Sequence, residues 1–155
     1  MDVAALIISI LAFGLSVLQF LRDTSRQKKE STLNAYNALQ YDAFEKLNKH
    51  EDLTRIDYDS PEWEEITICL AQIENFSVGI NTNIYSLEIL NRVGGSFFIQ
   101  KHRELSPIIE EKRERDTSRG KHYDEYEKTV ALLCKYRESR RGKIQIRLKR
   151  MIGLY

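Results

Sequence analysis

The feature that most constrains this fold is an uncharged, apolar run near the start of the chain, residues 3–21 (VAALIISILAFGLSVLQFL). As a helix rising 1.5 Å per residue, this run reaches across the roughly 30 Å hydrocarbon core of a bilayer. A buried core helix of a water-soluble protein is the alternative, but such helices usually keep one polar side toward water. The run therefore predicts a single transmembrane helix.

The sequence on either side of this run predicts its orientation. Because the chain begins Met1-Asp2, without the cationic start of a signal peptide, we expect the run to stay uncleaved. A cluster of basic residues follows it: Arg22, Arg26, Lys28 and Lys29. Such a cluster beside a first span stays in the cytoplasm, so the N-terminus is expected outside and the C-terminal domain inside.

Small and polar residues inside the run recur at steps of three and four and form a polar stripe: Ala5, Ser9, Ala12, Ser16 and Gln19. Packed transmembrane helices gain close approach and interhelical hydrogen bonds from such residues. The stripe therefore predicts a homo-oligomer, in which it packs helices together or, in a ring, lines a water-filled path. The alternative is that the serine hydroxyls bond back to the preceding turn and Gln19 reaches the headgroups.

The rest of the chain predicts one all-α domain. Residues 1–29 form the transmembrane helix with its basic flank, and residues 30–155 form a cytoplasmic helical domain with a basic C-terminal tail. Since residues 15–60 contain neither proline nor glycine, the membrane helix is expected to continue into this domain, although the pattern allows a break at residues 26–31.

Local signals divide the domain into further helices. Ser60, Pro61 and Glu62 predict the start of a long second helix, whose apolar steps continue to Ile84 and in which Gly79 allows another helix to approach. Residues 94–95 (GG) end that region, and Ser96 is expected to cap a third helix.

The C-terminal part is expected to contain a loop and a fourth helix. Pro107 is expected to kink the third helix, and residues 113–121 (RERDTSRGK) predict a loop. A fourth helix is expected from His122, with one side formed by Tyr123, Tyr126, Val130, Leu133, Cys134 and Arg137.

Cysteine and histidine usage gives no sign of a metal site. Cys69 and Cys134 lie in apolar helical patterns, so we expect buried thiols. The chain has no CxxC or HExxH motif and no glycine-rich phosphate loop. Neither a metal nor a cofactor is predicted.

Charge is concentrated in two regions of opposite sign. Acids outnumber bases in residues 42–74, whereas residues 135–150 carry eight lysines and arginines against one glutamate. The basic tail is predicted to bind RNA or anionic lipid through Arg140, Arg141, Lys143, Arg147, Lys149 and Arg150. A neighbouring copy's acidic region is the alternative partner.

One pair of residues has the chemistry of an RNA-cleaving site. Arg115 precedes His122 by seven positions, and metal-free RNA cleavage needs a base of near-neutral pKa together with a permanent cation. With Asp116, this arrangement resembles the R-x(4–6)-H motif of the HEPN superfamily, small helical domains that pair to form one ribonuclease site. The alternative is a surface loop with no chemistry.

The layout as a whole resembles the small membrane accessory proteins of type VI-B CRISPR systems: an N-out anchor, a helical domain and a HEPN-like motif. That resemblance implies a HEPN-like bundle, a bacterial inner-membrane location, a ring-forming pore that enhances antiviral defence, and an RNA-guided effector as partner. It also implies that nuclease activity is vestigial and that the protein is not an enzyme.

A broader resemblance, to bacterial proteins with one N-terminal span and a helical domain, lies in residues 74–80 (ENFSVGI) and 123–127 (YDEYE). Three functions therefore stay open, in this order: an oligomeric pore, a membrane-tethered HEPN-type ribonuclease, and a non-catalytic adaptor that binds RNA or lipid.

Overall fold

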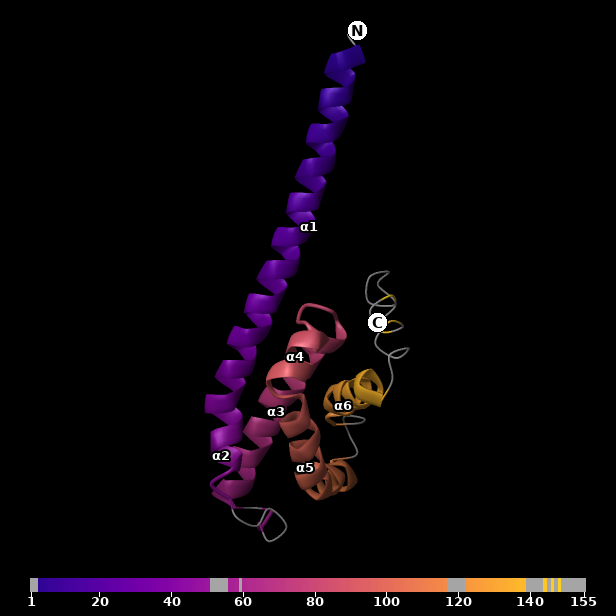
Figure 1. Ribbon diagram of the computed structural model, residues 1–155. Helices are drawn as coiled ribbons and strands as arrows, with labels where there is room; N and C mark the ends of the chain where they lie inside the picture. The colour runs from indigo at the N-terminus through magenta and orange to yellow at the C-terminus, as the bar shows by residue number, and fades with distance from the viewer. Residues whose placement is uncertain are drawn as a thin grey trace.

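The computed structural model describes residues 3–50, 56–58, 60–116 and 122–138, together with 144, 146 and 148. Every regular element in these residues is helical, which confirms the all-α prediction (Figure 1). The elements are α1 (Val3–Leu39), the π-helical turn η1 (Gln40–Phe44), α2 (Glu45–Leu47), α3 (Pro61–Asn81), α4 (Leu87–Val93), α5 (Gly95–Arg115) and α6 (Asp124–Glu138).

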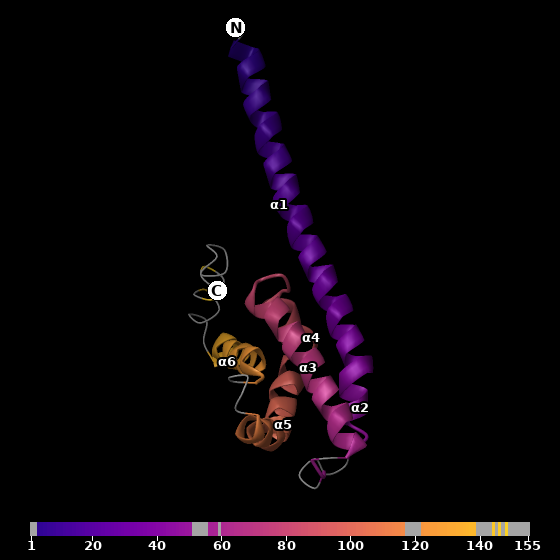
Figure 2. The same cartoon turned by 180° about the vertical axis from the view of Figure 1, so that it is seen from behind.

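The first helix is a long rod that runs through η1 into α2, so the predicted continuation is confirmed and no break occurs at residues 26–31. Its C-terminal half packs against the bundle, with Tyr36, Leu39, Ala43 and Phe44 in the core. Its N-terminal half projects away from the other helices (Figures 1 and 2). One helix is therefore both the projecting rod and a wall of the bundle.

The projecting half of α1 is apolar and uncovered. The described side chains from residue 6 to residue 27 are all exposed, Phe13 by 73% and Phe20 by 70%. None of its most apolar window is buried, so the alternative of a core helix is wrong. By length and composition, α1 can cross a membrane.

The start of α3 is as predicted, but its end is not. Ser60 Oγ accepts a hydrogen bond from Trp63 N at 3.2 Å, and Pro61 occupies the first turn. The helix ends at Asn81, so its predicted extension to Ile84 is wrong.

The chain turns after α3 because Tyr85 folds back onto the helix. Tyr85 N donates to Gly79 O at 2.8 Å, and a Cβ on Gly79 would stand 2.4 Å from the Tyr85 ring. Gly79 therefore receives an aromatic side chain rather than another helix. Asn83 takes a left-handed conformation, with φ of 65°, at the tip of this turn.

The short helix α4 was not predicted. Ser86 caps it by accepting a hydrogen bond from Ile89 N at 3.4 Å. At its end the Tyr36 hydroxyl occupies the space of a Gly94 Cβ, and α5 begins directly afterwards with no side-chain cap. The predicted capping by Ser96 is wrong, since Ser96 Oγ instead accepts a hydrogen bond from Arg137 Nη2 at 2.8 Å.

The last two helices correct the predicted loop. Pro107 lies inside α5, whose ribbon bends along its length (Figure 1). Because α5 continues to Arg115, the first residues of the predicted loop are helical, and residues 117–121 lie outside the described part. Cys69 is buried as expected, whereas Cys134 is half-buried. The buried residues of α6 are Tyr126, Thr129, Leu133 and Tyr136, which only partly match the predicted side.

Phe98 of α5 is the centre of the core. Its ring centroid lies 6.2 Å from that of Phe44, 6.0 Å from that of Phe76 and 4.8 Å from that of Tyr126. The Tyr126 hydroxyl also donates to Phe98 O at 3.0 Å. One aromatic ring therefore contacts η1, α3 and α6 together, in tilted and edge-to-face geometries that aromatic pairs favour.

Replacing Gly79 with alanine is expected to destabilise the bundle by about 1–3 kcal/mol, because the added methyl group overpacks against Tyr85. Gly14→Ala is the matched control, since nothing lies within 4 Å of its added Cβ. Chemical denaturation of the detergent-solubilised protein, followed by circular dichroism, measures both. Equal unfolding midpoints for the two variants would contradict the Tyr85 contact.

Candidate functional site

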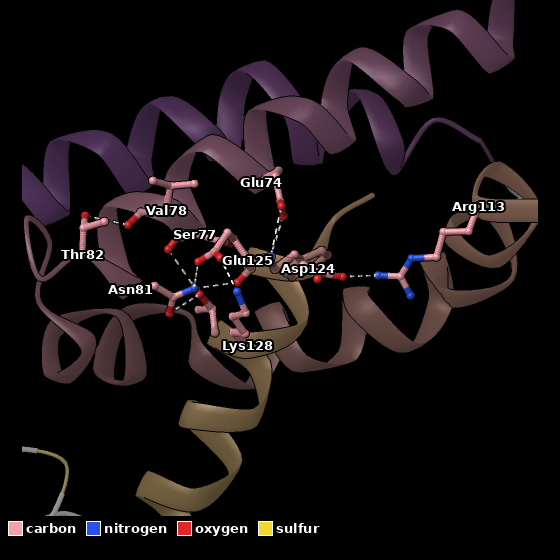
Figure 3. A network of polar contacts seen from close by, with 11 residues as sticks. Glu74, Ser77, Val78, Asn81, Thr82, Arg113, Asp124, Glu125 and Lys128 are labelled. Carbon is pink, nitrogen blue, oxygen red and sulfur yellow. Dashed lines mark hydrogen bonds and ion pairs between the residues drawn. The ribbon is translucent and has the colours of Figure 1, made fainter. Parts of the chain in front are cut away.

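A network of buried and half-buried polar groups joins α3 to the start of α6 (Figure 3). The Glu74 carboxylate accepts hydrogen bonds from Glu125 N at 3.0 Å and Tyr126 N at 2.8 Å. These amides belong to the first turn of α6. The N–H groups of a first turn have no acceptor within their own helix, and the positive end of the helix dipole lies there. Burial raises the pKa of Glu74, and the two amide hydrogen bonds oppose that rise.

Two helical turns further along α3, Asn81 extends the network. Its Nδ2 donates to Glu125 O at 2.9 Å and to the Glu125 carboxylate at 2.8 Å. The Thr129 hydroxyl lies 3.1 Å from Asn81 Oδ1 and 3.4 Å from Ser77 O. Two turns of α3 are therefore hydrogen-bonded to two turns of α6.

Arg113 holds the end of α5 against the same end of α6. Its Nε donates to His122 O at 2.8 Å, its Nη1 pairs with Glu127 at 2.7 Å, and its Nη2 lies 3.3 Å from Asp124. The hydrogen bond with Glu127 raises the pKa of Arg113. The Arg113 guanidinium thus links the end of α5 to the residues that begin α6. Among these residues, Tyr123 takes a left-handed conformation, with a φ of 64°.

Beside this network a groove of about 660 Å³ runs between the end of α3 and α6. Ala131 and Leu132 are among its lining residues, as are Lys128 and Lys135. Lys128 pairs with Glu125 at 2.5 Å, so part of the positive charge in the groove is already neutralised.

The predicted ribonuclease pair has separate partners in the described chain. Arg115 pairs with Glu111 at 2.8 Å, and its guanidinium carbon lies 3.9 Å from the centroid of the Tyr58 ring. His122 Nε2 lies 3.2 Å from Asp116 Oδ2, with 18% of the histidine side chain exposed. The structure therefore brings Asp116 and His122 into contact, but His122 Nε2 is buried and makes no hydrogen bond to the described residues.

The serines of the polar stripe lie on the side of α1 away from the bundle, whereas Gln19 lies about 100° around the helix axis from Tyr36 and lines the same hollow as Arg22. Ser9 and the core residue Tyr36 are about seven and a half turns apart on one unbroken helix, so they point in opposite directions. Ser16 Oγ donates to Ala12 O at 2.9 Å, which confirms the predicted back-bonding for that serine. Gln19 is exposed, and the side chain of Ala5 lies outside the described residues.

The tail residues predicted to bind RNA or lipid also lie outside the described residues: Arg140, Arg141, Lys143, Arg147, Lys149 and Arg150. Within the described ranges, no group of three or more histidine, cysteine, aspartate or glutamate side chains is placed to hold a metal ion.

Residues 3–132 match a family described as a domain of unknown function, DUF4760. The chain belongs to this family. The match begins in α1 and ends in α6, so the DUF4760 domain includes the apolar rod as well as the bundle. Neither a curated protein nor a solved structure matches the chain.

Both halves of the α3–α6 network fall inside the DUF4760 match. Sequence analysis gave no role to Glu74, Asn81 or Arg113. A signal for the first two was present: Glu74, Ser77 and Asn81 step by three and four along α3, which puts polar groups on an otherwise buried side.

Replacing Glu74 with alanine is expected to destabilise the bundle by about 1–3 kcal/mol, because two amides of α6 lose their acceptor. Glu110→Ala, at an exposed position of α5, is the matched control and should change stability little. Hydrogen exchange of the α6 amides, measured by mass spectrometry, should show faster exchange at residues 125–126 in the Glu74 variant alone. Unchanged exchange there would contradict the capping role.

Proposed function

We propose that this DUF4760 protein is a single-pass inner-membrane protein that assembles through α1 into a ring-shaped pore. Its bundle, which we take to be HEPN-like, lies in the cytoplasm. On this proposal it permeabilises the membrane to strengthen antiviral defence, as the resemblance to CRISPR accessory proteins implies. The observation that carries the proposal is the uncovered apolar half of α1, with the serines of its polar stripe directed away from the bundle.

The first support is the apolar surface itself. Large side chains project all around the rod, including Ile8, Leu11 and Phe13, each more than 60% exposed. Apolar surface left in water costs about 25 cal/mol per Å². A bilayer core covers such a rod on every side. The basic residues Arg22 and Lys29, which follow the apolar run and precede the bundle in sequence, favour a cytoplasmic bundle.

The second support is the direction of the stripe. If copies meet along Ser9 and Ser16, their α1 helices gather at the centre and their bundles extend outward, because these serines and the bundle lie on opposite sides of one helix. Such an arrangement closes into a ring without collision between bundles. The back-bonded hydroxyl of Ser16 uses its hydrogen and keeps both lone pairs free to accept hydrogen bonds from a neighbour or from water.

Replacing Ser16 and Gln19 together with leucine is expected to reduce ion flux through vesicles that contain the purified protein, because the stripe would lose its polar groups. Val17→Leu, on another side of the same helix, is the matched control and should leave flux unchanged. Mass measurement in detergent accompanies the assay. A strictly monomeric particle at every usable concentration would end the pore proposal.

A second candidate, a membrane-tethered HEPN-type ribonuclease, is favoured by the contact of His122 with Asp116 next to the end of α5. Single-stranded RNA incubated with the full chain is expected to be cleaved only if His122 is intact, so His122→Ala should abolish product formation. His50→Ala, at a position outside the motif, is the control. Equal cleavage by the wild-type and His122→Ala proteins would remove His122 from the mechanism, and no cleavage by either would favour the pore.

The adaptor function of the basic tail stays a third prediction.

A further inference from the structure

The turn between α3 and α4, residues 82–86, is fixed to α1 close to the end of the apolar run. Lys28 Nζ hydrogen-bonds Asn83 Oδ1, and Ser86 N donates to Thr32 Oγ1 at 2.7 Å. In both views, this turn is the part of the described bundle that lies nearest to the N-terminal half of α1 (Figures 1 and 2). The bundle has no linker that would let it move away from the apolar rod.

The position of the turn along α1 determines what it can touch if α1 crosses a bilayer. Lys28 lies seven residues after Leu21, the last residue of the apolar run, which is about 10 Å along the helix. The headgroup layer adds roughly 5–7 Å beyond each edge of the hydrocarbon core. Lys28, and the α3–α4 turn that it holds, therefore lie roughly 3–5 Å outside the headgroup layer, a gap that a side chain of the turn can bridge.

The turn presents an apolar side chain at this level. Ile84 is 62% exposed, next to the left-handed residue Asn83. Its backbone is held on both sides, because Tyr85 packs on Gly79 and Thr82 Oγ1 donates to Val78 O at 2.7 Å. Single exposed isoleucines are common on proteins, so the position of Ile84 beside the membrane, rather than its exposure, is the informative observation.

Two cations of α1 lie near this region: Arg22 directly follows the apolar run, about 9 Å before Lys28, and Lys29 directly follows Lys28. Tyr36 faces the core, and Lys29 and Arg22 precede it by about two and four turns, so both lie on the side of α1 where the bundle packs. Their side chains are exposed, and they line a hollow along α1 that also contains Leu15, Leu18, Gln19, Asp23, Ser25 and Arg26, so its cations outnumber its one acid. Along α1 the apolar residues of this hollow come first and the cations follow, which is the order of acyl chain and phosphate from the bilayer core outward.

We propose that the α3–α4 turn rests on the membrane surface, with Ile84 in the headgroup layer and Arg22 and Lys29 binding the phosphate groups of anionic phospholipids. This inference rests on the proposed membrane crossing of α1, but not on pore formation. It assigns the bundle a second contact with the membrane, so that the orientation of the bundle depends on lipid charge.

An environment-sensitive fluorophore on single cysteines tests the proposal in the full-length protein, in vesicles with and without anionic lipid. The Cys134→Ser background leaves only the buried Cys69, which maleimides do not reach. Labels go on Ile84→Cys, on Phe13→Cys in the apolar run, and on Ile68→Cys. Ile68 is 52% exposed and lies in α3 about 20 Å before the turn, so it is the matched control.

Lipid-borne quenchers are expected to quench the label at residue 84 several-fold more than that at residue 68, and more strongly with anionic lipid. Arg22→Gln with Lys29→Gln should remove that dependence on lipid charge. If residue 13 is quenched but residue 84 behaves like residue 68, the membrane-contact turn is wrong while the anchor stands. Quenching at residue 84 that ignores lipid charge overturns the phosphate-binding role. If residue 13 escapes quenching, the anchor and this inference fail together.

Discussion

The structure depends on the continuity of α1. The same helix exposes an apolar rod at its N-terminal end and supplies Tyr36, Leu39 and Phe44 to the core at the other. Because no proline or glycine interrupts residues 15–60, the backbone hydrogen bonds run from one part to the other. The bundle could not lose α1 without losing a wall of its core, so the apolar rod and the folded domain form one unit, as the extent of the DUF4760 match also indicates.

The π-helical turn η1 adjusts this helix to the core. In a regular α-helix Phe44 would lie about 80° around the axis from Tyr36, away from the bundle. The π-turn takes up one extra residue and rotates the later side chains back. Phe44 can then contact Phe97 at a centroid distance of 4.9 Å and Phe98 at 6.2 Å. Since π-turns have no local sequence signature, sequence analysis predicted a regular helix here.

Local chemistry made some helix ends predictable, and tertiary contacts decided the others. The start of α3 could be predicted because Ser60 and Pro61 act within one turn. Its end could not, because Ile84 keeps the apolar spacing and only the packing of Tyr85 on Gly79 turns the chain. The helix α4 was missed for the same reason, and Arg115 was assigned to a loop although its stacking on Tyr58 helps to extend α5.

The candidate site shows the same limit. The polar residues of α3 were visible as a pattern, but their partners are backbone amides of α6, which have no sequence signal. The polar stripe could be predicted from spacing, yet its direction relative to the bundle required knowing which side of α1 is buried. The proposed assembly depends on that direction, because a stripe on the bundle side would keep copies apart.

The contacts between α1 and the α3–α4 turn make the position of the bundle depend on the direction of α1. The α3–α4 turn is held to α1 through Asn83 and Ser86, and α3 in turn holds α6 through Glu74 and Asn81. Any change in the tilt of α1 is therefore carried through α3 to α6 without a flexible joint between the described elements. If copies assemble as proposed, helices that gather along the polar stripe tilt together, and the proposed assembly and the orientation of the bundles are then coupled.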